Sequence, residues 1–204
     1  NLVKGIHLEG FRALGNANDF IEKYYLDDAD EILLNDVVAS LYNRNTLHDL
    51  IKKITKKIFI PLIAGGGIKN IKDIEYLLKS GADRVFLNSS AIKNPNIINE
   101  CCKYFGSSTI LISIEAIKKG DTYFCLTDFG REETNVNAID WAEEVQDRGV
   151  SEIIVTSIEK EGTGKGFDLE LAEKISNRIK IPFIINGGFG ELNHLDDLFN
   201  CSFP

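Results

Sequence analysis

The sequence predicts an α/β protein, a (β/α)8 TIM barrel built from two duplicated half-barrels. Three features of the 204 residues predict this fold. Short apolar runs alternate with amphipathic segments, as they do in βαβ units. A motif of Ile-Pro, an apolar run and a Gly cluster occurs twice, as IPLIAGGGIKN from residue 60 and as IPFIINGGFGE from residue 181. Identical residues also recur at a fixed separation of 121 positions.

Six near-continuous apolar runs are the expected strands, because parallel strands buried on both faces are apolar throughout. They cover residues 31–35, 58–64, 84–88, 109–115, 152–156 and 181–186. The segments IKDIEYLLKSG and AIDWAEEVQDRG are expected helices that end before Gly81 and Gly149, since Gly is favoured just past a helix C-terminus. The segment KKGDTYFCLTDFG alternates polar and aromatic residues around Gly-Asp and predicts a hairpin after the fourth run.

The repeat indicates how much of a barrel the chain holds. Pro182 follows Pro61 by 121 residues, and Gly188 follows Gly67 by the same number. Duplicating four βα units gives eight strands and about 250 residues. The 121-residue shift places the partners of the runs at 109–115 and 84–88 beyond the two ends of the chain. We therefore expect one barrel domain over residues 1–204 that holds strands two to seven, with the first and last strands missing from the given chain.

Composition narrows the function classes. The formal net charge is −8, so no basic surplus exists for nucleic acid or for an anionic membrane surface. No apolar stretch reaches the ~18 residues of a membrane span. The four cysteines, two of them adjacent, suit neither a disulfide framework nor a metal site and indicate a reducing cytoplasm. The three histidines have no metal-ligand spacing and are expected at the surface.

The two Gly clusters suggest a ligand. In a (β/α)8 barrel the loops after the strands form the active face, and a Gly-rich turn that enters a helix binds phosphate through backbone N–H groups. A Gly cluster alone is also explained by a tight turn. Two such turns related by a duplication lie on opposite sides of one barrel mouth, however, and predict a small-molecule substrate with a phosphate at each end.

Further motifs resemble the cyclase subunit of imidazole glycerol phosphate synthase, from histidine biosynthesis. They are VKG (3–5), DEILLNDVVAS (30–40), IPLIAGGGI (60–68), GADRVFLNSSAIKNP (81–95), FGSS and ISIEA (105–116), SEIIVTSIEKEGT (151–163), GFDLEL (166–171) and IPFIINGG (181–188). The resemblance covers nearly the whole chain. The combination of a Gly triplet, an Asn-Ser pair and the SIEKEGT segment makes it specific.

The resemblance implies a lyase that needs no cofactor and no metal. Such barrels receive ammonia from a class-I-type glutaminase subunit, which forms a heterodimer with the N-terminal face of the barrel. At the C-terminal face, ammonia attacks a bisphosphorylated ribulosyl-aminoimidazole-carboxamide intermediate. Cyclisation gives imidazole glycerol phosphate and releases an aminoimidazole carboxamide ribotide, with two carboxylates acting as general acid and base.

Residue roles follow position by position from the same resemblance. The strand-five carboxylate is Glu115, which is expected to be catalytic. The residues expected to bind substrate and phosphate are Lys4, Asp36, Gly67, Asn88, Ser89, Glu161, Gly162, Thr163, Asn186 and Gly188. Three charged residues at strand starts, Glu31, Arg84 and Glu152, match an ammonia gate at the glutaminase face. Ordinary ion pairs at the bottom of the barrel would explain the same three charges.

Departures from the family keep other functions open. Glu115, Glu159 and Glu161 stand where the family has Asp, and Asn186 replaces a Ser. An extra methylene moves a carboxyl by about 1 Å, which can cost about a hundredfold in rate. The segments VVASLYNRN and SIEA resemble a branch that serves surface-polysaccharide biosynthesis, in which the barrel passes ammonia to a sugar amidotransferase. The isomerase of the preceding histidine step, with the same duplicated barrel, is a third alternative.

Overall fold

The computed structural model describes residues 1–39 and 47–201. It separates into two units. The first contains Asn1–Val3 and Ala13–Leu111, and the second contains Lys4–Arg12 and Ile112–Pro204. Each unit is described by itself below, and the expectation of one barrel domain over residues 1–204 stays a prediction. Residues 40–45 of the segment VVASLYNRN, which carries part of the resemblance to the polysaccharide branch, lie outside the described residues.

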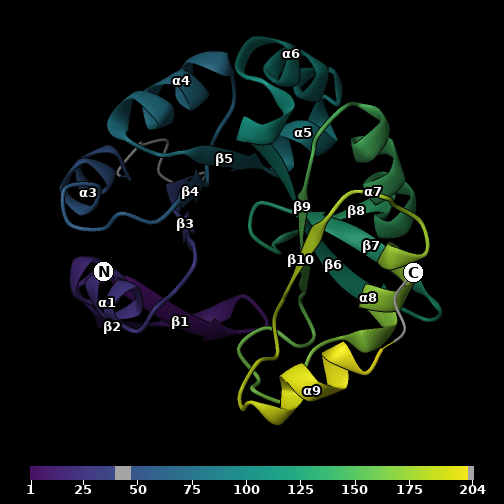
Figure 1. Cartoon of the computed structure of the whole chain (residues 1–204). Coiled ribbons are helices and arrows are strands. Elements are labelled where there is room, and N and C mark those ends of the chain that lie inside the picture. The colour runs from purple at the N-terminus through teal and green to yellow at the C-terminus, as the bar shows by residue number, and fades with distance from the viewer. Residues whose placement is uncertain (40–46, 202–204) are drawn as a thin grey trace. The chain divides into compact units, whose positions relative to one another are not determined.

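The first unit is built on three parallel strands, β3 (Ile32–Asn35), β4 (Leu62–Gly65) and β5 (Arg84–Leu87). Every residue of β4 is buried, as its continuous apolar run predicts. The helices of this unit are α1 (Ala17–Leu26), α3 (Leu47–Ile54), α4 (Ile71–Ser80), α5 (Ser89–Lys93) and α6 (Asn96–Phe105), followed by the 3-10 turn η1 (Ser107–Thr109). Figure 1 shows α3 and α4 side by side on the outer side of these strands.

Local signals fix the ends of α4. Asn70 and Asp73 form a capping box, in which each side chain accepts a hydrogen bond from the backbone of the other residue. Gly81 ends the helix in a left-handed conformation with φ of 115°, which suits a residue without a Cβ. The predicted helix over 71–80 is therefore confirmed.

The second unit also has parallel strands at its centre. β9 (Ile153–Ser157) pairs with β10 (Phe183–Asn186) on one side and with β6 (Ile110–Lys119) on the other. The predicted hairpin is present, because β6 continues through a turn at Gly120 into the antiparallel strands β7 (Thr122–Thr127) and β8 (Glu132–Asn137). The helices are α7 (Ala138–Asp147), α8 (Leu169–Ser176) and α9 (Asn193–Phe199).

The two units repeat one another in register. Ile32 pairs with Leu62 between β3 and β4, and Ile153 pairs with Phe183 between β9 and β10. Each of the second residues lies 121 positions after the corresponding first one. Helices α1 and α7 are related by the same shift, and an Asn side chain caps each of them. The duplication and the α/β class of (β/α)8 type that the sequence predicts are thus confirmed.

One element was not expected. Residues Leu2–Ile6 and Glu9–Gly15 form the hairpin strands β1 and β2, which correspond to β7 and β8 at the 121-residue separation. At its tip, in the second unit, His7 and Leu8 have φ values of 56° and 60°. Leu8 is buried against Leu126 and Ile158. The N-terminal hairpin and the helix α1 that follows it are therefore the counterparts, in the first half of the duplication, of β7, β8 and α7.

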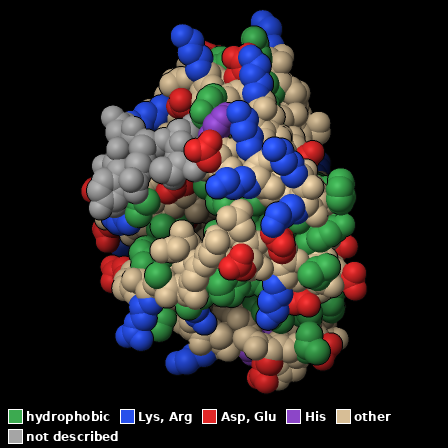
Figure 2. Space-filling view, turned by 90° about the vertical axis from the view of Figure 1, so that its left-hand side faces the viewer, with side chains coloured by type: hydrophobic (Ala, Val, Ile, Leu, Met, Phe, Trp, Pro, Cys, Tyr) green, Lys and Arg blue, Asp and Glu red, His purple; other side chains and the backbone are tan. Residues whose placement is uncertain are grey.

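Charge is distributed unevenly on the surface. Exposed lysines cluster on α3 and just past its end, at Lys52, Lys53, Lys56 and Lys57. Figure 2, which faces the side of the molecule where α3 lies, shows several Lys and Arg side chains close together. Within the described parts of the chain, no helix combines the length and the hydrophobicity that a membrane crossing needs.

Candidate functional site

A pocket of about 450 Å³ lies in the second unit, between the loop after β9 and the loop after β10. Six of the residues predicted to bind substrate or phosphate line it: Lys4, Glu161, Gly162, Thr163, Asn186 and Gly188. Because they come from three separate segments, their convergence is a result of the fold. The remaining lining residues are Gly164, Gly187, Phe189 and Gly190, so backbone makes up much of the wall.

The hairpin tip holds the loop after β9. The backbone N–H of His7 donates to the carbonyl oxygen of Glu161 over 2.9 Å. Gly162 has φ of 72° and lies so close to the hairpin that a Cβ there would meet the carbonyl oxygen of Gly5 at 2.1 Å. Only Gly fits this position, and the close approach brings Lys4 to the pocket.

Burial and charge act in opposite directions on Glu161. Its partly buried position raises the pKa of the carboxyl above the ordinary value, because the charged form loses hydration. The positive charge of Lys4 opposes this shift of the Glu161 pKa. The pocket thus combines one cation, one carboxyl whose charged form is disfavoured, and the backbone of several glycines.

The two pocket loops are joined to each other and to the sheet. Gly166 N–H donates to the carbonyl oxygen of Gly188 over 2.8 Å. Asn186, the last residue of β10, donates from Nδ2 to Oγ1 of Thr156 on β9 over 3.1 Å. These contacts fix the spacing of the two loops across the pocket.

The prediction that His194 lies at the surface is wrong, because only 8% of the residue is exposed. Its Nδ1 accepts hydrogen bonds from the backbone N–H groups of Gly190 and Glu191, at 3.1 and 3.3 Å. His194 therefore fixes the backbone of the loop after β10 through these two hydrogen bonds. The sequence signal that could have predicted this contact is a His four residues after a Gly-rich turn.

Glu115 lies within β6, which continues for four residues beyond it. The residue is 5% exposed, and its Oε2 accepts a hydrogen bond from Gly130 N–H over 2.9 Å. Burial, with a smaller contribution from the negative charge of Glu115, raises the pKa of the neighbouring Cys125 thiol to about 12. Glu115 is not among the residues that line the pocket, so its expected catalytic role stays a prediction.

The other expected binding residues belong to the first unit. Asp36, Gly67 and Asn88 follow the ends of β3, β4 and β5, and Ser89 begins α5. Asp36 accepts from Val38 N–H through Oδ1 over 3.1 Å and donates its own N–H to the carbonyl oxygen of Gly65 over 3.0 Å. Among the described residues, Oδ1 of Asn88 is buried without a hydrogen-bond partner. Such an atom is commonly satisfied by water or by a ligand.

The expected gate residues lie at strand starts. Glu31 directly precedes β3, Arg84 begins β5, and Glu152 directly precedes β9. In the first unit an oxygen of Glu31 lies 3.6 Å from Nη1 of Arg84, and Arg84 Nε donates to the carbonyl oxygen of Ser108 over 3.0 Å. Two of the three predicted charges are therefore brought together as an ion pair.

Among the described residues, the side chains that commonly bind metals do not gather in one place. In residues 1–39 and 47–201, no group of three or more His, Cys, Asp or Glu side chains could hold a metal ion. All four cysteines are free thiols, and Cys101 and Cys125 are buried.

Comparisons with known proteins identify the family. A family model described as "Histidine biosynthesis protein" matches residues 1–203. Imidazole glycerol phosphate synthase subunit HisF of Legionella pneumophila is 45% identical over 96% of this chain and 93% of its own length. HisF of Petrotoga mobilis is 39% identical over 97% of this chain and 79% of its own length, and HisF of Campylobacter concisus is 42% identical over 97% and 78%. The chain therefore belongs to the HisF family of histidine biosynthesis proteins.

Proposed function

We propose that this protein is the cyclase subunit of an imidazole glycerol phosphate synthase. The observation that carries the proposal is the pocket of the second unit, where Lys4, Glu161 and the backbone of the Gly-rich loops line one cavity in a member of the HisF family. Backbone N–H groups with one lysine suit a phosphate group, because they supply donors and a positive charge without a basic surface. The substrate is a bisphosphorylated ribulosyl-aminoimidazole-carboxamide intermediate.

The reaction needs a nucleophile and proton transfers. Ammonia adds to the ribulosyl carbonyl carbon of the substrate, water is lost, and ring closure releases the aminoimidazole carboxamide ribotide. Glu115 is the group of this chain that we assign to moving a proton, since it is buried and its Oε2 is held by Gly130 N–H. Lys4 and the Gly loops hold the phosphate and so fix the position of the substrate.

A second phosphate site is proposed in the first unit, around Gly67, Asn88 and Ser89. Gly67 corresponds to Gly188 in the duplication, and both adopt positive φ, at 67° and 95°. The buried Oδ1 of Asn88, which has no partner among the described residues, supports a polar ligand there. One anion site in each half of the duplication is the arrangement that the sequence predicts for a substrate with two phosphates.

The first prediction concerns phosphate binding. Crystals of the protein soaked in phosphate or sulfate should show one anion against Gly162 and Gly188 and another against Gly67 and Ser89, because both turns present backbone N–H groups. The measurement is difference density at each position. Anions found only elsewhere on the surface contradict the proposed pair of sites.

We also propose a glutaminase as the partner, in keeping with the word "subunit" in the names of the relatives. Ammonia released into water would be protonated and lost, so a barrel that uses it benefits from a closed junction with the enzyme that produces it. Glu31 and Arg84 lie at the strand starts of the first unit, away from its Gly turn. Phe59, three residues before the start of β4, is 82% exposed, and exposed aromatic residues are typical of interfaces. Because free thiols persist in a reducing compartment, we place this protein and its glutaminase partner in the cytoplasm.

The second prediction tests this junction. Arg84→Ala removes one partner of the Glu31 ion pair, so more glutamine should be hydrolysed per product formed in the reconstituted pair, while turnover with added ammonium changes little. Arg148→Ala is the matched control, since Arg148 also forms an ion pair and its side chain is similarly exposed, 23% against 22% for Arg84. An equal hydrolysis ratio for the two variants contradicts the gate.

An ammonia-channelling role in sugar amidation is the second candidate. It is favoured by Glu115, Glu159 and Glu161, which stand where the resembled cyclases have Asp. Turnover of the bisphosphate substrate by the full-length protein with ammonium salts separates the two functions. No product at high ammonium contradicts the cyclase and leaves the channelling role.

A further inference from the structure

The loop between β9 and α8 is closed at its base by the side chains that flank it. Ser157 is the last residue of β9, and Asp168 caps the N-terminus of α8. Ser157 Oγ donates to Oδ2 of Asp168 over 2.7 Å. Both residues are buried, with 1% and 7% of their surface exposed. The ten residues between them, 158–167, thus form a loop whose two ends are joined by this hydrogen bond.

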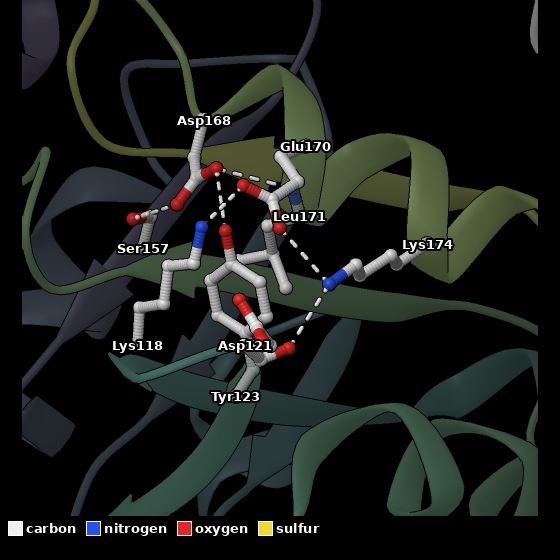
Figure 3. Close-up of polar contacts among 8 residues, drawn as sticks. All are labelled: Lys118, Asp121, Tyr123, Ser157, Asp168, Glu170, Leu171 and Lys174. Carbon is white, nitrogen blue, oxygen red and sulfur yellow. Dashed lines mark hydrogen bonds and ion pairs between the residues drawn. The ribbon is translucent and has the colours of Figure 1, made fainter.

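The other oxygen of Asp168 is also used. Its Oδ1 accepts from the hydroxyl of Tyr123 over 3.0 Å and from the backbone N–H of Leu171 over 3.1 Å. Figure 3 shows these contacts converging on the carboxylate from three elements, β9, β7 and α8. A buried carboxylate with three donors is well compensated, and hydrogen bonds to a charged acceptor are stronger than neutral ones.

Tyr123 is itself held in place. The ammonium groups of Lys118 and Lys174 lie 5.7 and 5.5 Å from its ring centroid, and both lysines form ion pairs with Glu170 (Figure 3). Burial and the negative charge of Asp168 raise the pKa of the Tyr123 hydroxyl well above its ordinary value. The hydroxyl therefore stays protonated at neutral pH and remains a donor to Asp168.

The arrangement is specific to the second half of the duplication. At positions 121 residues earlier, Asp36 stands in place of Ser157, Leu47 in place of Asp168, and Leu2 in place of Tyr123. The first half therefore lacks the Ser, Asp and Tyr side chains that close the loop base. A feature that only one half contains is not required by the barrel architecture itself.

We propose that Asp168 is a positioning residue, which fixes the phosphate-binding loop after β9 through its bonds to Ser157 and Tyr123. The proposal rests on the proposed function, because that loop supplies Glu161 and Gly162 to the pocket. Asp168 does not line the pocket and acts through the loop. The ligand that benefits is the phosphate group of the substrate bound in the second unit.

Ser157→Ala and Tyr123→Phe each remove one of the bonds to Asp168 with little change of shape, and Asp168→Asn removes the charge of the shared acceptor. Asn is as good a helix N-cap as Asp, so the last variant keeps α8 capped while it removes the charge. Ser80→Ala is the matched control, because it deletes a buried serine hydroxyl in the first unit, which donates to the carbonyl oxygen of Tyr76 and also contacts Nδ1 of His48.

Hydrogen exchange of the full chain without ligand is the primary measurement. Exchange of the amides of residues 158–167 should rise by about tenfold in Ser157→Ala and in Tyr123→Phe, the effect of losing one hydrogen bond to a charged group. It should also rise in Asp168→Asn, where the acceptor loses its charge, while amides of β9 and α8 change less in all three variants. The Kd for inorganic phosphate at this pocket, followed by the chemical shifts of the Gly162 and Gly188 amides, should rise by a similar factor. Ser80→Ala should change neither quantity.

Each outcome decides either the positioning role of Asp168 or the proposed function. Unchanged exchange in the loop, or an equal rise over the whole chain, overturns the positioning role, because a merely structural residue gives one of these results. Faster loop exchange with unchanged phosphate affinity overturns it too. If the parent protein shows no phosphate at Gly162 and Gly188, the proposed function fails, and the exchange data still decide whether Asp168 fixes the loop.

Discussion

Replacing Glu115 by Gln should lower kcat for the bisphosphate substrate, with ammonium salts as the nitrogen source, by about a hundredfold or more. General acid–base catalysis by one positioned group contributes about 10²–10⁴-fold to rate, and Gln can neither accept nor release the proton. The fold should survive, because the Gln side-chain oxygen can accept the hydrogen bond that Gly130 N–H makes to Glu115 at 2.9 Å. Steady-state kinetics of the full-length protein, with its melting temperature, are the measurements.

Glu115→Asp is the control that separates the proton from its position. Asp keeps the acid and base function but shortens the side chain by one methylene, a displacement of about 1 Å that can itself cost a large factor. We expect activity between those of the parent and Glu115→Gln. A Glu115→Gln variant with parent activity contradicts the catalytic assignment, whereas one that fails to fold points to a structural role for the buried carboxyl.

The architecture could be predicted because the sequence shows both the apolar strands and the duplication directly. Strands such as β4 are buried throughout and so read as apolar runs. The duplication preserved residues that fix backbone geometry, among them Pro61 and Pro182, whose carbonyl oxygens accept from Ile32 and Ile153 N–H at 3.0 and 3.3 Å. Any residue can supply such a carbonyl oxygen, but Pro also fixes φ in both halves, and its recurrence makes the separation of 121 positions visible.

The N-terminal hairpin escaped prediction because tertiary packing overrides its local preferences. A tight hairpin usually carries Asn-Gly or a similar pair at its tip, but here His7 and Leu8 adopt positive φ. That conformation is unfavourable for residues with a Cβ. Burial of Leu8 against Leu126 and Ile158 offsets the cost. No pattern within the segment indicates those contacts, although its relation to β7 and β8 by the duplication does.

In the site, the residues that touch the pocket were predictable and those that support it were not. Gly162 and Gly188 stand out in sequence because their turns exclude other residues. Asp168 precedes a helix, and an N-cap role explains it fully when only the sequence is considered. His194 lies in a polar stretch, which favours an exposed position. The bonds of both residues depend on segments brought together by folding, from Tyr123 and Ser157 for Asp168 and from the preceding turn for His194.

The closest backbone approach at the pocket makes Gly188 the most sensitive of its lining positions. A Cβ built on Gly188 would lie 2.0 Å from the carbonyl oxygen of Gly166, while Gly166 N–H donates to the carbonyl oxygen of Gly188 over 2.8 Å. The two loops therefore meet backbone to backbone. No rotation of a side chain can relieve the clash, and a methyl group there would have to push the loops apart.

Gly188→Ala should destabilise the protein by about 3 kcal/mol or more and remove phosphate binding at this pocket, since steric strain at a special backbone position is among the largest single-residue effects. Gly149→Ala isolates the clash from the backbone conformation. Gly149 has φ of 98°, close to the 95° of Gly188, but nothing lies within 4 Å of its Cβ position. It should cost only the left-handed penalty of about 1–2 kcal/mol and leave phosphate affinity intact. Urea unfolding and phosphate titration of both variants measure the two effects. Equal destabilisation would mean that the loops after β9 and β10 move apart readily, and the pocket would then not be held by that contact.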